Sequence, residues 1–199
     1  MSSQSREAKL VETFVVLADT LVPGYDVIDM LNTLVESSSA LLGASAAGIL
    51  LVDTHGNLDV VACTGERGRL VESMQLRSSG GPCVECFTTG RSVTVPDIER
   101  LGAHWDRFRS EAIAQGFMAL HAVPLRLRAE TIGSLSLFWN QLHILTPRDI
   151  DIIQALADVA TISILQERAM RDSRLLTEQA KGRSDRTLTL KTVGSRPPR

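Results

Sequence analysis

The sequence contains few cysteines, little net charge and no long apolar run. Its three cysteines, an odd number in 199 residues, fit a reducing compartment better than a disulfide framework. The longest apolar segments, such as residues 44–52, are far shorter than the ~20 residues that cross a bilayer, and the N-terminus lacks the apolar core of a signal peptide. We therefore expect a soluble, cytoplasmic protein that does not bind membranes.

The net charge of −2 gives the chain no general attraction to nucleic acids. Residues 181–199 differ from the rest, because they carry six basic side chains against one acidic side chain. A basic tail on an acidic body is usually a disordered end and less often a nucleic-acid-binding arm. Helical patterning stops near residue 182, so we expect residues 183–199 to form a disordered basic tail.

The order of helical and strand patterns predicts a single α+β domain. Apolar residues at Leu10, Phe14, Leu17 and Leu21 predict a helix over residues 6–21, and similar spacing predicts another over residues 26–42. Hairpin-linked strands with helices at both ends of the chain indicate an antiparallel sheet of about five strands flanked by helices. The expected strands cover residues 44–53, 58–64, 92–95, 119–126 and 131–140.

A last helix is expected to begin at Thr146-Pro147-Arg148-Asp149, which has the residue types of a capping box. An apolar seam with a three-four spacing follows, formed by Ile150, Ile153, Ala157, Ala160 and Ile164. Such a seam packs either on the domain's own sheet or on a partner helix. Together with the first helix it predicts a homodimer.

Several short motifs occur in a characteristic order between residues 10 and 166. They are Gly81-Pro82-Cys83 before a helix, Val93-x-Val95-Pro96-Asp97, His121-Ala122-Val123-Pro124-Leu125, and Ile132-Gly133-Ser134-Leu135-Ser136-Leu137. In this order and spacing they resemble the GAF domain, a small-molecule sensory module of bacterial signalling proteins. The resemblance implies a non-enzymatic sensor of a small molecule or of redox state, which takes part in signal transduction.

Residues 175–182, Leu-Leu-Thr-Glu-Gln-Ala-Lys-Gly, are similar to the opening helix of the ANTAR domain. ANTAR is an RNA-binding antiterminator module that often follows GAF in actinobacterial regulators. The similarity implies a regulator of transcription whose output domain is truncated, and so no specific RNA binding. The expected division is a tail at 1–9, a GAF sensory domain at 10–166, a helical extension at 167–182 and a basic tail at 183–199.

Cys83 and Cys86 form a CxxC pair that allows several interpretations. A zinc site would need two more ligands, for which Cys63 and His121 are the plausible candidates. Cys83 at a helix start could be an activated thiol, and a similar loop carries the catalytic cysteine of GAF-fold free methionine-R-sulfoxide reductases, which are the alternative function. Their further reactive cysteines are not matched here, so Cys83 and Cys86 are also interpreted as small buried residues.

Ligand-binding candidates gather around the expected central strand. They are Cys83, Phe87, Trp105, Phe108, Phe117, Met118 and His121. Apolar pockets with a few polar contacts are the usual form of such sites, although these aromatic residues could equally fill a core, and a lone strand histidine is often structural. The signature of cyclic-nucleotide-binding GAF domains is absent, and neither a cofactor nor a metal follows from the sequence.

Overall fold

The computed structural model describes residues 3–19, 26–78, 80–128 and 130–193 of the chain. The chain divides into two units, Met1–Ser163 and Ile164–Arg199. In chain order the elements are α1 (Ser3–Asp19), α2 (Val27–Leu42), β1 (Ala46–Val52), β2 (Leu58–Cys63), α3 (Gly65–Ser78), α4 (Pro82–Thr89), β3 (Val93–Val95), the 3₁₀ turns η1 (Ile98–Arg100) and η2 (Ala103–Trp105), α5 (Asp106–Ala114), β4 (Ala119–Leu127), β5 (Glu130–Trp139) and α6 (Pro147–Val193).

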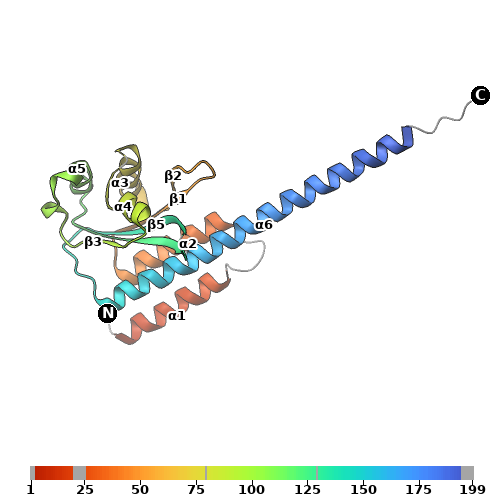
Figure 1. Ribbon diagram of the computed structural model, residues 1–199. Helices are drawn as coiled ribbons and strands as arrows, with labels where there is room; N and C mark the ends of the chain where they lie inside the picture. The colour runs from red at the N-terminus through yellow and green to blue at the C-terminus, as the bar shows by residue number, and fades with distance from the viewer. Residues whose placement is uncertain (1–2, 20–25, 79, 129, 194–199) are drawn as a thin grey trace, which may run out of the picture. The chain divides into compact units, whose positions relative to one another are not determined.

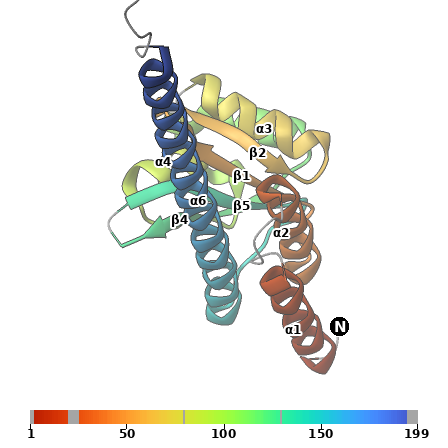
Figure 2. The same ribbon diagram turned by 90° about the vertical axis from the view of Figure 1, so that its right-hand side faces the viewer.

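The first unit is built on one five-stranded sheet in the order β2-β1-β5-β4-β3. All the neighbouring strands are antiparallel, so the predicted α+β fold with an antiparallel sheet is confirmed. Figures 1 and 2 show helices α3, α4 and α5 on one face of the sheet, and α2 with the first part of α6 on the other. The sheet is therefore the middle layer of three.

Alternation along the strands assigns side chains to these two faces. Leu50, Leu120 and Phe138 point to the α3–α5 face, where they join the buried apolar cluster described below. His121 pairs with Leu137 in the register of β4 and β5. Each directly neighbours a member of this set along its strand, Leu120 and Phe138, so both point to the opposite face. This division decides which of the predicted site residues can meet.

Local sequence signals explain where the helices begin and end. Asp26 caps α2 by accepting a hydrogen bond from the amide of Ile28 at 2.7 Å, and Gly43 ends the helix in the left-handed conformation. The predicted capping box of α6 is confirmed. The Asp149 carboxylate accepts from the Thr146 amide at 2.9 Å, and the Asp149 amide donates to the Thr146 hydroxyl at 3.2 Å.

The predicted apolar seam of α6 lies mostly inside the domain. Ile153, Ala157 and Ala160 are fully buried in the first unit, whereas Ile150 is 37% exposed. Of the two expected roles of the seam, packing on the domain's own sheet therefore describes these three residues. They are not available as an interface to a partner helix.

The sequence predicts that helical structure ends near residue 182, but α6 continues as an unbroken helix to Val193. Residues 183–193 contain neither glycine nor proline, the residues that break helices most strongly, and Gly194 follows directly. The structure therefore describes helix over residues 183–193, where the sequence predicts a disordered tail, and residues 194–199 lie outside the described part. Among the described helices, none combines the length and apolar character needed to cross a bilayer.

Candidate functional site

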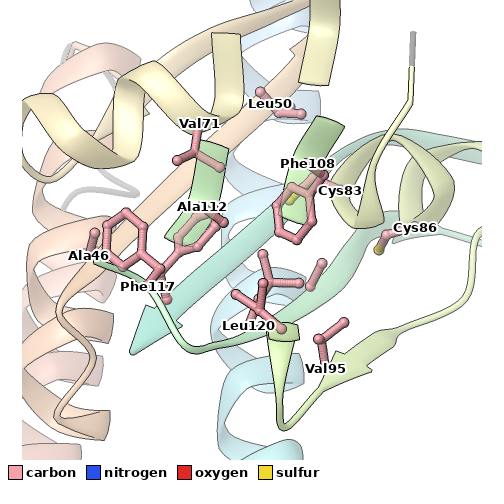
Figure 3. Packing of buried hydrophobic residues seen from close by; sticks show 13 residues of the cluster. Ala46, Leu50, Val71, Cys83, Cys86, Val95, Phe108, Ala112, Phe117 and Leu120 are labelled. Carbon is pink, nitrogen blue, oxygen red and sulfur yellow. The ribbon is translucent and has the colours of Figure 1, made fainter. Parts of the chain in front are cut away.

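A cluster of buried apolar side chains fills the space between the sheet and helices α3, α4 and α5 (Figure 3). Phe108 and Phe117 are its large members from α5 and the segment after it, and Trp105 packs against it while remaining partly exposed. The Phe117 ring lies 5.0 Å from the Phe138 ring, centroid to centroid. Side chains therefore occupy the centre of this layer.

A groove lies at the edge of this cluster, and we call it the rim groove. Its volume is about 270 Å³, and its lining comes from the end of α3 and from the segment that runs from η2 into α5. The lining residues are Ser78, Gly80, Ala103, His104, Trp105, Asp106, Arg107 and Phe108. Two of the predicted ligand-binding residues, Trp105 and Phe108, thus meet in one groove.

Hydrogen bonds fix the segment from η1 to α5, which carries Trp105 and most of the groove lining, to the rest of the domain. The amide of Ile98 donates to the Met118 carbonyl at 2.8 Å, and Arg109 donates to the Leu101 carbonyl at 2.7 Å. Arg109 also forms an ion pair with Asp106 at 2.6 Å. The groove then offers an aromatic surface at Trp105 beside exposed positive charge at Arg107.

A buried polar network lies next to the apolar cluster, and we call it the acid network: Glu72, Gln75, Cys83, Ser136 and the carbonyl of Gly48. Gln75 Nε2 donates to Glu72 Oε2 at 3.0 Å and to Cys83 Sγ at 3.2 Å, while the Cys83 amide donates to Gln75 Oε1 at 3.0 Å. Glu72 Oε1 is hydrogen-bonded to Ser136 Oγ and contacts Cys83 Sγ at 3.6 Å. Ser136 Oγ lies 3.2 Å from the Gly48 carbonyl.

Burial controls the ionisation of this network. It raises the pKa of Glu72 to about 7, against the lowering effect of hydrogen bonds from Ser136 and Cys83. Burial and the nearby Glu72 carboxyl also raise the pKa of Cys83 well above its usual value. Gly48 makes room for the acid, because a Cβ atom at this position would lie only 3.1 Å from Glu72 Oε1.

The surroundings of the cysteines oppose the reactivity that the helix-start position of Cys83 suggests. Cys83 and Cys86 are both fully buried, and burial raises the pKa of Cys86 to about 12. Desolvation outweighs the helix N-terminus here, which disfavours an activated thiol at Cys83 and favours the interpretation of Cys83 and Cys86 as small buried residues. Cys63 is half-buried, and its pKa is likewise raised to about 12, mainly by burial.

His121 is separated from the other candidates by the sheet. Its side chain is buried on the face that α2 and α6 cover, where Nδ1 lies 2.8 Å from Thr94 Oγ1. Nε2 has no hydrogen-bond partner among the described residues. Burial lowers the pKa of His121 to about 4, which keeps the ring neutral at pH 7.

The structure thus divides the predicted site residues into groups. Cys83, Cys86, Phe108 and Phe117 belong to the buried cluster, with Trp105 packed against it. Phe87 and Met118 are partly buried outside that cluster, and His121 lies on the opposite face.

Sequence reasoning missed Glu72, Gln75 and Ser136. A weak signal existed in α3, because Gly68, Glu72 and Gln75 follow a four-three spacing that places them on one buried face. Within the described ranges, no group of three or more histidine, cysteine, aspartate or glutamate side chains could hold a metal ion.

Comparison with known families gives a match over most of the first unit. A family model described as GAF domain matches residues 25–164. A comparison with curated proteins gave no match at the required significance.

Solved structures similar to this chain share its fold. A free methionine-R-sulfoxide reductase from Neisseria meningitidis in complex with its substrate is 19% identical, with a TM-score of 0.65 over 85% of this chain and 95% of that chain. The GAF domain of a phosphoenolpyruvate-protein phosphotransferase from Coxiella burnetii is 15% identical, with a TM-score of 0.65 over 83% of this chain and 98% of that one. A domain of a two-component sensor histidine kinase protein from Sinorhizobium meliloti is 20% identical, with a TM-score of 0.61 and coverage of 73% and 95%.

Proposed function

Because the chain belongs to the GAF domain family, whose members are sensory, ligand-binding signalling modules, we propose that it is a non-enzymatic sensor that binds a small molecule in the rim groove. The observation that carries the proposal is the position of Trp105. Its ring packs on the buried cluster on one side and remains partly exposed in the groove. An aromatic ring held in this way is a surface on which a planar ligand stacks.

The charges at the groove favour a planar ligand that carries negative charge. Asp106 is paired with Arg109 at 2.6 Å, whereas the exposed Arg107 and His104 line the same groove. The His104 ring lies beside Trp105 and is tilted by 36° to it, with ring centroids 4.4 Å apart. An aromatic carboxylate or a phosphorylated aromatic would contact the indole ring and the guanidinium group together.

Native mass spectrometry of the purified protein, followed by a screen of aromatic carboxylates, tests this proposal. Only two tryptophans occur in the chain, and Trp139 is buried, so quenching of exposed tryptophan fluorescence reports on Trp105. Trp105→Ala should abolish retention of the ligand, while Ile144→Ala, which alters an 85% exposed apolar residue outside the groove, should retain it. A ligand held equally by both variants would place the binding site elsewhere.

The reductase alternative has a specific observation against it. A nucleophilic thiol must reach its substrate as a thiolate, but Cys83 is fully buried and its pKa is raised well above the usual value. Likeness to the Neisseria reductase at 19% identity concerns the fold alone. Turnover of free methionine sulfoxide coupled to a thiol reductant would contradict the non-enzymatic proposal.

We further propose that the protein acts as a cytoplasmic homodimer, through a surface different from the one that the sequence suggests. Ala8, Val11 and Val15 lie on one face of α1, where the valines are 63% and 54% exposed. Their three-four spacing is that of a coiled-coil seam. This face replaces the α6 seam as the surface offered to a second copy.

We also propose that the chain is the sensory and dimerisation module of a transcription regulator of the antitermination type. This proposal is supported by the similarity of residues 175–182 to the first helix of ANTAR domains, and the described helix α6 passes through this segment. We expect no specific binding of hairpin RNA by this chain. Fluorescence anisotropy with a labelled hairpin at physiological salt measures it, and a tight, sequence-dependent complex would contradict this expectation.

A further inference from the structure

The number of hydrogens in the acid network distinguishes neutral Glu72 from ionised Glu72. The network contains six polar contacts: Glu72 with Ser136, Ser136 with the Gly48 carbonyl, Gln75 with Glu72, Gln75 with Cys83 Sγ, the Cys83 amide with Gln75, and Cys83 Sγ with Glu72. Each contact needs one hydrogen between its two atoms.

When Glu72 is neutral, the network has one hydrogen for each of its six contacts. The Glu72 hydroxyl donates to Ser136, whose own hydroxyl then donates to the Gly48 carbonyl. The two hydrogens of the Gln75 amide group, the Cys83 amide and the Cys83 thiol fill the other four contacts. When Glu72 is ionised one hydrogen is missing, because the Ser136 hydroxyl cannot donate to Glu72 and to Gly48 at once.

No positive charge compensates an ionised Glu72 within the described residues around it. The groups that face it are Gln75 from its own helix, Cys83 and Cys86 from α4, Gly48 from β1, Cys63 from β2 and Ser136 from β5. The charged side chains of the neighbouring helices are engaged elsewhere. On α3, Arg67 donates a hydrogen bond to the Gln115 carbonyl, and the charge of Arg69 lowers the pKa of Cys63. On α5, Asp106 forms an ion pair with Arg109, and Glu111 accepts a hydrogen bond from Gln115. An ionised carboxylate here is therefore both unpaired and short of one hydrogen bond.

The acid network is joined directly to the wall of the rim groove. The backbone carbonyl of Gln75 accepts hydrogen bonds from the Gly80 amide at 3.1 Å and from Ser78 Oγ at 3.3 Å. Ser78 and Gly80 both line the groove. Gln75 thus contacts Glu72 through its side chain and the groove wall through its backbone.

We propose that Glu72 is a proton-binding site through which pH sets the conformation of the α3–α4 junction (residues 75–78 and 80–83), and with it the shape of the rim groove. The step is a simple release of the Glu72 proton to solvent, which breaks one hydrogen bond at Ser136. The part that concerns the groove rests on the proposed function, whereas the proton site itself does not. The protein would then report pH together with its ligand.

The strength of the expected effect follows from linkage. Burial raises the pKa of Glu72 from 4.5 to about 7, so opening of the junction, which returns the side chain to water, becomes easier as pH rises through this interval and levels off above it. The opening constant should increase by up to tenfold per pH unit, by about a hundredfold between pH 4.5 and 7, and by roughly a few hundredfold in total.

Carbon-13 NMR of labelled glutamate side chains tests the proton site directly. The wild-type protein should show a carboxyl that titrates near pH 7, and Glu72→Gln should lack it. Glu85→Gln, which alters an exposed acid on α4, is the matched control and should keep it. Ser136→Ala removes the hydroxyl that is hydrogen-bonded to Glu72, so the midpoint of this titration should shift, which assigns the signal even if Glu72→Gln does not fold. Absence of any such titration in the folded wild-type protein would overturn the proposal.

Amide hydrogen exchange tests the conformational part. After correction for the intrinsic exchange rate, residues 80–85 should lose protection by about a hundredfold from pH 4.5 to 7 in the wild type and Glu85→Gln, but not in Glu72→Gln. Equal pH dependence in Glu72→Gln and the wild type would overturn it. A pH-dependent junction without any groove ligand would contradict the proposed function alone, and a bound ligand with a pH-independent junction would contradict this inference alone.

Discussion

Glu72 and His121 are buried on opposite faces of one sheet, and each binds protons differently in the folded and the unfolded chain. Burial raises the pKa of Glu72 from 4.5 to about 7, so folding is favoured at low pH and this contribution is lost as pH rises through the interval. Burial lowers the pKa of His121 from 6.5 to about 4, so its contribution is complete above pH 6.5 and is lost as pH falls. Between pH 4.5 and 6.5 the two effects oppose each other.

We therefore predict that these two residues leave the free energy of unfolding of the wild type nearly constant between pH 4.5 and 6.5. Glu72→Gln removes one of the opposing effects, and its free energy of unfolding should rise by about 2 kcal/mol over the same interval because of His121. Urea unfolding at a series of pH values measures both curves, with Glu85→Gln as the control that follows the wild type. Parallel curves for Glu72→Gln and the wild type would contradict the assignment.

The position of Gly81, at the start of α4, requires glycine for two reasons: its backbone conformation and the closeness of the Gln75 side chain. Its φ of +140° lies in a region that other residues rarely adopt, and a Cβ atom there would collide with the side chain of Gln75. Gly81→Ala should therefore cost at least about 3 kcal/mol and disturb the acid network. Gly56→Ala is the matched control, because Gly56 also has a positive φ, of +86°, but open space around it, so only a strain of about 1 kcal/mol is expected. Similar losses in urea unfolding would show that the contact with Gln75 does not matter.

At the scale of elements, α6 has an apolar seam that packs inside the domain and a separate set of exposed positions. Ala157 is fully buried, while Ile162 on the same helix is 44% exposed. Ala157→Glu would place an unpaired carboxylate in a packed core, and we predict a loss of more than about 3 kcal/mol, seen as a lower thermal midpoint or an unfolded protein. Ile162→Glu should change stability by no more than about 1 kcal/mol. If Ala157→Glu instead gives a folded protein of lower molecular mass, the seam is an interface between chains.

The elements themselves could be predicted because their signals are local. The strand pairs and the helix at residues 26–42 follow from periodicity, turns and caps within a few residues of their observed limits. The acid network could not be predicted, since Glu72 and Ser136 are 64 positions apart and meet only once β5 lies beside β1 under α3. The choice between a core seam and an interface at Ala157 also depends on tertiary packing, which the periodicity of the helix does not contain.

At the scale of the molecule, the proposed ligand and proton sites lie on the α3–α5 face, whereas α2 packs on the other face of the sheet and α1 packs against α2 (Figure 1). The central strands β1 and β5 connect these layers. Gly48 and Ser136 are paired across them in the acid network, and their neighbours Ile49 and Leu137 point to the opposite face. A change at the acid network can therefore reach α2 through one strand, and α1 through α2.

The dimer prediction belongs to this scale, because it concerns the surface that such a change would reach. Val11 and Val15 are large apolar side chains that α1 leaves exposed on one face, and burying them against a second copy would remove both from water. We expect the unmodified protein to show twice the 21.7 kDa chain mass in light scattering at micromolar concentration, and Val11→Glu with Val15→Glu to show one chain mass while remaining folded by circular dichroism. Ile144→Glu, which alters another exposed apolar residue, should stay dimeric. A single chain mass for the unmodified protein, or a double mass for the α1 variant, would show that this face of α1 is not the dimer interface.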